Sequence, residues 1–241
     1  MPETPVLVTI LIILSASFLR SAVGFGDALV SVPPLTLLLG TETAMPLVVL
    51  VGLTIAGTIL AFNWKSVRFS AAAKLIGAAM LGILPGAMML RFMPESYLKI
   101  MVGLVVAGFG LYNLRRPVLP HLPGGKTTYL FGFVAGLLGG ATAISGPPVV
   151  IYGQMRRWSP GHFRATMQGF FFPTGLMIAL EQGASGMWTS KVGWLYLIAL
   201  PTLATGIFLG GIVNRRMTPG KFNKLVYTIL VISGLVLIFS S

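Results

Sequence analysis

The sequence lacks cysteine and contains only two histidines, His121 and His162. Without cysteine the chain can form no disulfide bond, thiolate metal site or dithiol redox motif. The two histidines are far apart in the sequence and fall in expected loops, which argues against a metal site built on them. The phosphate-binding pattern G-x-x-x-x-G-K-[ST] is also missing, so we expect no ATP hydrolysis by this chain. We therefore expect no metal and no cofactor.

Charged residues are scarce, at 9% of the chain against roughly 25% in a soluble domain. Hydrophobic residues make up 55%, and the mean hydropathy is +0.89. So few charges cannot cover a water-facing surface, so most of the surface must face lipid. We expect an all-α polytopic membrane protein, because helices satisfy their own backbone hydrogen bonds in a bilayer. A soluble enzyme is excluded on the same ground.

Acidic residues are the scarcer charge: five Asp and Glu stand against 17 Lys and Arg, a net charge of +12. Strongly basic chains often bind nucleic acid. Here the basic residues lie between apolar runs instead of forming one patch. We interpret them as residues that set membrane topology, and we expect no nucleic-acid partner.

Long apolar runs dominate the chain, and a full span needs about 20 such residues. Two stretches, 5–39 and 128–155, are too long for one span and are broken near their middle by Gly, Ser and Pro. We expect each of them to fold back as two short helices, a hairpin within the membrane. The first stretch has no basic leader and no clear cleavage site, so we interpret it as a retained segment. The single spans are expected at 45–63, 75–93, 97–114, 163–181, 191–213 and 222–240.

The two breaks resemble each other. Residues 26–35, GDALVSVPPL, align without gaps on residues 140–149, GATAISGPPV, with matching Gly, Ser and both Pro. The chain is therefore predicted to be one membrane domain, 1–241, made of two repeats, 1–118 and 119–241. Each repeat holds a broken hairpin and three spans, about eight to ten membrane segments in all. Five passages per repeat would make the two repeats inverted.

Basic residues between the spans are distributed unevenly. When each hairpin is counted as an in-and-out pair, 13 Lys and Arg fall on one side of the membrane and 3 on the other. Cytoplasmic loops collect Lys and Arg, so both termini are predicted to lie outside the cytoplasm. Trp64, Trp158 and Trp188 lie near segment ends, where interfacial tryptophans are enriched.

Interrupted apolar segments at matching positions of inverted repeats are typical of secondary transporters. A half-helix that starts inside the membrane has a partially positive N-terminus, which favours anions. Ser145 is placed to cap a half-helix that begins at Gly146, with proline in its first turn. Ser31 is expected to cap a matching half-helix in the first repeat. The alternative, that these Gly and Pro residues only permit packing and kinks, stays open.

The candidate substrate-binding residues lie in the breaks or on a neighbouring span. Arg20 and Asp27 are ionisable groups in an apolar stretch, which is costly in lipid. Arg20 could pair with an anionic substrate and Asp27 could carry a coupling proton, or the two could form a structural ion pair. Gln168 could donate to an oxyanion or bond to another helix. The full set is Arg20, Gly26, Asp27, Ser31, Gly140, Thr142, Ser145, Gly146 and Gln168.

These elements resemble the TauE/SafE family of sulfite and organosulfonate exporters. The resemblance rests on the Gly-Phe-Gly-Asp run at 24–27 with its later Pro-Pro pair, and on the element from Gly139 to Tyr152. It covers nearly the whole chain, although Phe25 and Asp27 stand where the family usually has more glycine. The resemblance implies transport of a small anion, such as sulfite or an organosulfonate, across the inner membrane.

Two functions are kept open at this point. The first is a secondary transporter with alternating access around the two breaks, and the second is an anion channel that uses the same helix ends. An intramembrane enzyme is disfavoured, because Asp27 is the only acid clearly within a span. We expect a multi-pass inner-membrane protein that binds a small anion and membrane lipid, and whose driving force is either a coupling proton or the membrane potential. Homo-oligomer formation is left open.

Overall fold

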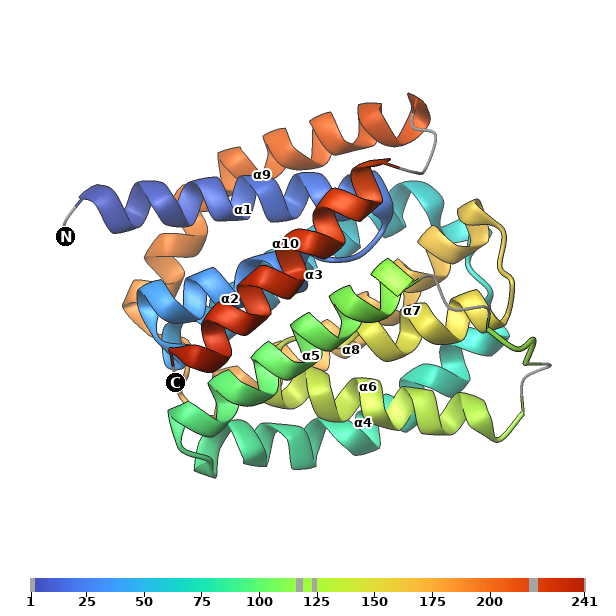
Figure 1. Cartoon of the computed structure of the whole chain (residues 1–241), viewed down its shortest axis with the longest axis horizontal. Helices are drawn as coiled ribbons and strands as arrows, with labels where there is room; N and C mark the ends of the chain where they lie inside the picture. Colours follow the sequence, from blue (N-terminus) through green and yellow to red (C-terminus); the bar gives the residue numbers. More distant parts are fainter. Residues whose placement is uncertain (1–2, 116–118, 123–124, 217–220, 241) are drawn as a thin grey trace.

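The computed structural model describes residues 3–115, 119–122, 125–216 and 221–240, with side chains for 5–115, 119–122, 125–214 and 226–240. These residues form ten α-helices and one short 3-10 helix, η1 (Trp64–Ser66), and no strand, which confirms the all-helical fold class (Figure 1). The helices are α1 (Glu3–Val23), α2 (Asp27–Leu39), α3 (Thr41–Asn63), α4 (Phe69–Phe92), α5 (Glu95–Arg115), α6 (Thr127–Thr142), α7 (Gly146–Met155), α8 (Pro160–Ala184), α9 (Ser190–Arg216) and α10 (Lys221–Phe239).

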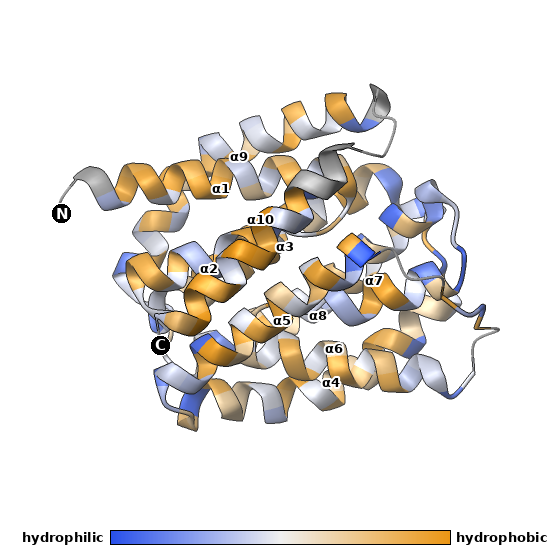
Figure 2. Ribbon diagram, viewed as in Figure 1, coloured by the Kyte–Doolittle hydropathy of each residue, from blue (hydrophilic) through white to orange (hydrophobic). Residues whose placement is uncertain are grey.

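The helix surfaces are those of a membrane protein. Within the described residues, α1, α3, α4, α5 and α9 are long and apolar enough to cross a bilayer. Leu81, Leu104, Leu197 and Phe208 are each between 60% and 71% exposed, as side chains that face lipid would be. Figure 2 shows hydrophobic residues along the length of the helices and hydrophilic residues gathered at the two ends of the bundle.

The first broken stretch differs from its prediction. α1 has 21 residues, about 31 Å at 1.5 Å per residue, so it is a full-length helix and only α2, with 13 residues, is short. α1 is continuous up to Val23, just before the glycines. Within it the hydroxyls of Thr9 and Ser15 donate to carbonyls four residues earlier, which is common for these side chains inside a helix. The second stretch forms two short helices as expected, α6 with 16 residues and α7 with 10.

Both breaks are made by residues with a left-handed backbone. Gly24 and Gly26 have φ values of +100° and +102°, which L side chains rarely adopt. At the second break, Ala143 has φ 59°, and its N–H bonds to the Gly139 carbonyl to end α6. The chain therefore turns at the positions where the sequence predicted interruptions.

The helices pack in pairs that exchange between the two halves of the chain. α1 packs along α9 and α6 along α4, while α3 packs on α8 and α5 on α10. The helices α1–α5 have α6–α10, in the same order, as their counterparts. When each helix is replaced by its counterpart, the same set of pairs results. Figure 1 shows α5 and α10 running in opposite directions. Inverted repeats would give this pattern, and both the inversion and the repeat boundaries at 1–118 and 119–241 stay predictions.

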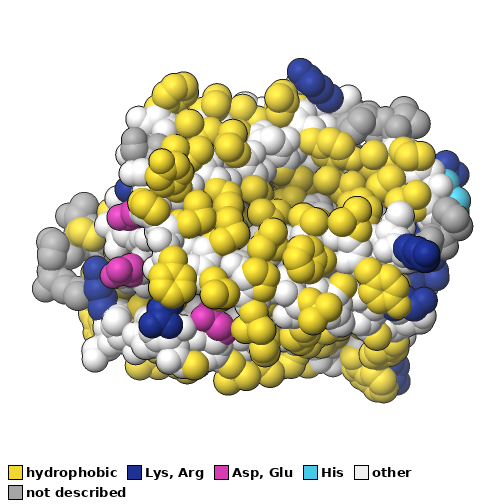
Figure 3. Space-filling model, turned by 90° about the horizontal axis from the view of Figure 1, so that it is seen from below, with side chains coloured by type: hydrophobic (Ala, Val, Ile, Leu, Met, Phe, Trp, Pro, Cys, Tyr) yellow, Lys and Arg dark blue, Asp and Glu magenta, His cyan; other side chains and the backbone are white. Residues whose placement is uncertain are grey.

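The two ends of the bundle differ in charge. In Figure 1, α1 begins and α10 ends at the same end. Figure 3 shows Asp and Glu side chains near one edge of the visible face, with some Lys and Arg beside them, and Lys, Arg and His without acidic neighbours at the opposite edge. Among the 13 basic residues predicted for one side, Arg116 and the side chains of Arg215, Arg216, Lys221 and Lys224 lie outside the described part. Which end faces the cytoplasm stays a prediction.

Candidate functional site

A small cavity lies where the two breaks meet. Its volume is about 50 Å³, and Arg20, Gly26 and Asp27 of the first break line it together with Ser145 and Gly146 of the second. Its walls come from α3 and α8. The structure thus brings together two breaks that are more than 100 residues apart in the sequence, as their matched positions predicted.

Two helix N-termini face this cavity. α2 begins at Asp27 and α7 at Gly146, and both residues are part of the lining. The first intrahelical bond of α2 runs from the Val30 N–H to the Gly26 carbonyl, so the N–H groups of residues 27–29 precede the helical ladder. In α7 the first turn holds Pro147 and Pro148, which have no N–H. The positive ends of both helices therefore point toward one small space.

The expectation that Ser31 caps a half-helix is wrong. Ser31 lies within α2, and its buried hydroxyl donates to the Asp27 carbonyl at 2.7 Å. The helix starts earlier because the positive φ of Gly26 already turns the chain, which leaves Pro33 and Pro34 inside the helix. The residues of α2 that line the cavity are Asp27, Ala28 and Leu29, at the start of the helix, and not those after Ser31.

Ser145 holds the N-cap position of α7, as predicted, but its side chain makes no capping hydrogen bond. The residue is half-buried and lines the cavity. Its hydroxyl can therefore donate to a ligand in the cavity instead of capping the helix. The neighbouring Gly146 also lines the cavity, and a Cβ there would lie 3.8 Å from Phe171 Cζ.

Arg20 and Asp27 form the ion pair that was one of the two alternatives left open. Arg20 Nη1 lies 2.6 Å from Asp27 Oδ2, and the two residues are 4% and 6% exposed. Removal of one partner would leave the other charge buried and uncompensated. Asp27 is also the first residue of α2, where the positive helix end favours a carboxylate.

Gln168 fixes the orientation of Arg20 and does not itself line the cavity. Its Oε1 accepts from Arg20 Nε at 3.1 Å and from Nη2 at 3.0 Å, and its Nε2 donates to the Gly24 carbonyl at 2.6 Å. The guanidinium carbon also lies 4.7 Å from the centre of the Phe171 ring. Of the five N–H donors of Arg20, three are used within the described residues, and two are left for a ligand.

Two other predicted residues lie away from the cavity lining. Thr142 is fully buried and donates to the Leu138 carbonyl at 2.7 Å. Gly140 faces α4, where a Cβ would overlap the Ile83 carbonyl oxygen, so this glycine permits close helix packing. The sequence could not distinguish these positions from the lining, because it does not specify which side of α6 faces the cavity.

The structure also adds residues that sequence reasoning missed. Gly52 of α3 lies against the ion pair: a Cβ there would be 3.2 Å from both Arg20 Nη1 and Asp27 Oδ2. Gly175 of α8 lines the opposite wall of the cavity. The first break is held in addition by Asn214, which donates to the Ala22 carbonyl and accepts from Arg164. With 30 glycines in the chain, no sequence signal singled out Gly52 and Gly175.

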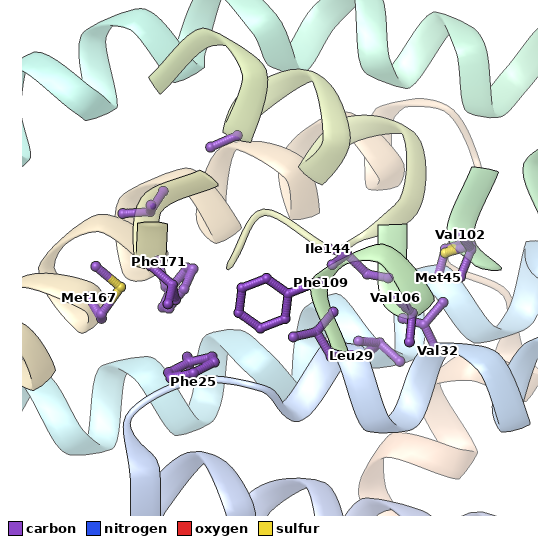
Figure 4. Packing of buried hydrophobic residues seen from close by; sticks show 14 of the residues in the cluster. Phe25, Leu29, Val32, Met45, Val102, Val106, Phe109, Ile144, Met167 and Phe171 are labelled. Carbon is purple, nitrogen blue, oxygen red and sulfur yellow. The ribbon is translucent and has the colours of Figure 1, made fainter. Parts of the chain in front are cut away.

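Phe25, which interrupts the glycines of the first break, belongs to the apolar core. Its ring packs edge-on against Phe109 and Phe163, with ring centres 6.0 and 6.2 Å apart. Figure 4 shows Phe25, Leu29, Phe109 and Ile144 gathered in the same interior region, so both breaks contribute to one cluster. The aromatic side chain thus anchors a loop whose backbone is otherwise set by glycine.

The sequence is similar to those of known membrane transporters. The chain matches the family described as "Sulfite exporter TauE/SafE" over residues 9–237. The probable sulfite/organosulfonate exporter TauE of Cupriavidus necator is 25% identical over 164 residues, 65% of this chain and 64% of that protein. The match therefore spans less than two thirds of that relative's length. The probable inner membrane transporter protein TsaS of Comamonas testosteroni is 25% identical over 176 residues, 72% and 73% of the two chains. No solved structure gives a significant match.

Proposed function

We propose that this chain, which belongs to the TauE/SafE sulfite exporter family of membrane transporters, is a secondary transporter for a small sulfur oxyanion. The observation that carries the proposal is the cavity between the breaks, where Arg20 and the N-termini of α2 and α7 converge. Sulfite and organosulfonates are the proposed substrate class, the class named for the Cupriavidus relative.

The donors around the cavity suit an oxyanion. Arg20 offers two further N–H groups, Ser145 a hydroxyl and Gly146 a backbone N–H, while the helix ends add partial positive charge. A cavity needs roughly 10–15 Å³ to hold one water molecule, so about 50 Å³ suits a ligand of a few heavy atoms. A group such as sulfite or the head of a sulfonate fits this description.

Alternating access is the proposed mechanism. Broken helices can move as units on either side of a central site, as in other transporters with interrupted helices. The protein would act in the cytoplasmic membrane, where the TsaS relative is named as a transporter. We propose no catalytic role, because Asp27 is the single acid among the described residues that line the cavity, and it is already paired with Arg20.

The decisive experiment is counterflow in proteoliposomes. Purified protein is reconstituted with unlabelled sulfite or methanesulfonate inside, and the labelled anion is added outside. We expect transient accumulation of label that excess sulfite suppresses. Large single-channel currents without counterflow would favour a channel. No uptake of sulfite, thiosulfate, sulfoacetate, taurine or methanesulfonate by correctly inserted protein would overturn the proposed function.

A further inference from the structure

The charges around the cavity are few. Among the described lining residues, Arg20 is the only base and Asp27 the only acid, and they are paired. Gln168 on α8, which bonds to Arg20, and Ser145, which lines the cavity at the second break, are uncharged. Arg164 of α8 is a charged residue that lies against Gly24 of the first break, where it donates to Asn214. Of the helices packed on α2, α3 offers Gly52 at the pair, α5 offers apolar core residues, and α10 offers Tyr227, which lines a separate small cavity beside Gly26.

We propose that the Asp27 carboxylate occupies the position on Arg20 that the substrate oxyanion takes during transport. Protonation of Asp27 frees Arg20 for the anion, so that one proton moves with each monovalent anion. This inference rests on the transporter function proposed above. It assigns the coupling ion and a direction of coupling to the same site.

The reason is electrostatic balance in a buried space. In the empty state, the positive Arg20 and the negative Asp27 sum to zero. An anion added to this state would place two negative charges beside one guanidinium, where water screens them poorly. If Asp27 takes a proton from water on the entry side, the loaded site again sums to zero. The O–H bond breaks on the exit side, when the carboxylate pairs with Arg20 again and the proton returns to water.

The hydrogen bonds permit this exchange without loss of the binding site. Gln168 holds Arg20 through Nε and Nη2, so the guanidinium keeps its place when the carboxylate leaves Nη1. Asp27 follows Gly26, whose backbone is free of side-chain restraint. The carboxylate is therefore the mobile partner of the pair and Arg20 the fixed one.

The test separates a pH gradient from a membrane potential. Methanesulfonate is the probe, because its sulfonate stays ionised across the pH range used. In one arm the pH gradient is imposed, and equal potassium on both sides with valinomycin holds the membrane potential at zero. In the other arm a potassium gradient with valinomycin imposes the potential, and the same buffered pH on both sides holds the pH gradient at zero. One pH unit, acidic outside, is expected to give about tenfold accumulation of label. A potential alone is expected to give none. Accumulation driven by the potential and not by the pH gradient would overturn the inference.

Variants locate the proton. Asp27→Asn is expected to lose the pH-driven accumulation, while Asp27→Glu keeps it. Glu42→Gln removes an exposed acid from the first turn of α3 and serves as a matched control that behaves as wild type. Unchanged pH-driven accumulation by Asp27→Asn would contradict the assignment. If Asp27→Asn fails to insert, the accumulation by the wild-type protein under each gradient and the pH-driven accumulation by Asp27→Glu still test the inference.

The two proposals can fail separately. Wild-type counterflow without any response to the pH gradient would refute proton coupling and leave the transporter function intact. Wild-type protein without counterflow would refute both. Coupling of this kind drives uptake when protons flow inward, and a high cytoplasmic anion concentration would drive export through the same cycle.

Discussion

Gln168 is the residue that holds the candidate site in shape. It bonds to Arg20 twice and to the Gly24 carbonyl once, and it is fully buried. We expect Gln168→Ala to lower the free energy of unfolding by roughly 1–3 kcal/mol, because it removes three hydrogen bonds and leaves Arg20 less compensated. Counterflow should fall as well. Thermal unfolding in detergent measures the first effect.

The matched control is Gln154→Ala, since Gln154 is the same side chain in an exposed position on α7. It should keep the wild-type melting temperature. An equal melting temperature for the Gln168 and Gln154 variants would show that the three hydrogen bonds do not stabilise the protein.

Gly52 sets how closely α3 approaches the ion pair. Gly52→Ala would place a Cβ 3.2 Å from atoms of both partners, so the pair must shift. We expect transport to fall several-fold, with a stability loss of roughly 1–3 kcal/mol for the added atom. Gly77→Ala, in α4 with nothing within 4 Å of the new Cβ, is the control. Wild-type counterflow from Gly52→Ala would remove Gly52 from the site.

At the scale of the helices, the two breaks are similar in sequence and different in structure. Pro33 and Pro147 align in the sequence, yet α2 begins six residues before Pro33 and α7 begins one residue before Pro147. The difference follows from Gly26, whose left-handed backbone lets α2 start at Asp27. A helix boundary thus depends on a local dihedral angle that the aligned Pro-Pro pairs did not reveal.

The start of α7 carries a prediction about ligand binding. Ser145→Ala removes a hydroxyl that makes no capping bond, so it should weaken anion binding modestly with little change in stability. Gly146→Val should be more severe, because a branched side chain would enter the small cavity beside Phe171. Counterflow at several anion concentrations distinguishes the two. Wild-type transport from Gly146→Val would refute a ligand held at this helix end.

The contact of α4 with α6 depends on glycine. A Cβ at Gly136 would overlap the backbone of Ala79, so Gly136→Ala must force the two helices apart. We expect a marked loss of stability, seen as a lower melting temperature. Gly108→Ala, in α5 with open space around the new Cβ, should be neutral or slightly stabilising. Equal melting temperatures for both variants would contradict the close packing.

At the scale of the whole molecule, orientation in the membrane follows from charge. The 13-to-3 distribution of basic residues predicts both termini outside the cytoplasm. Alkaline phosphatase fused after residue 241 should then be active, and a cytoplasmic fluorescent reporter at the same place should be dark. The reverse result would invert the assignment of the two faces and leave the fold unchanged.

Composition and pattern in the sequence were enough to determine the class of the protein. Scarce charge and long apolar runs require helices in lipid, because only such surfaces and self-satisfied backbones are stable there. Two interrupted segments with matching Gly, Ser and Pro located the breaks, and Arg20 and Asp27 stood out because ionisable groups are costly in an apolar stretch.

Only the tertiary structure decided which atoms meet. It paired Arg20 with Asp27, placed Gln168 from the second half of the chain on Arg20, and brought Gly52 against both. It also moved the start of α2 from Ser31 to Asp27. These facts depend on helix rotation and on contacts between helices, one of them between residues 148 positions apart. Apolar periodicity does not encode them, since helices that are apolar on all sides give no signal for which side faces the cavity.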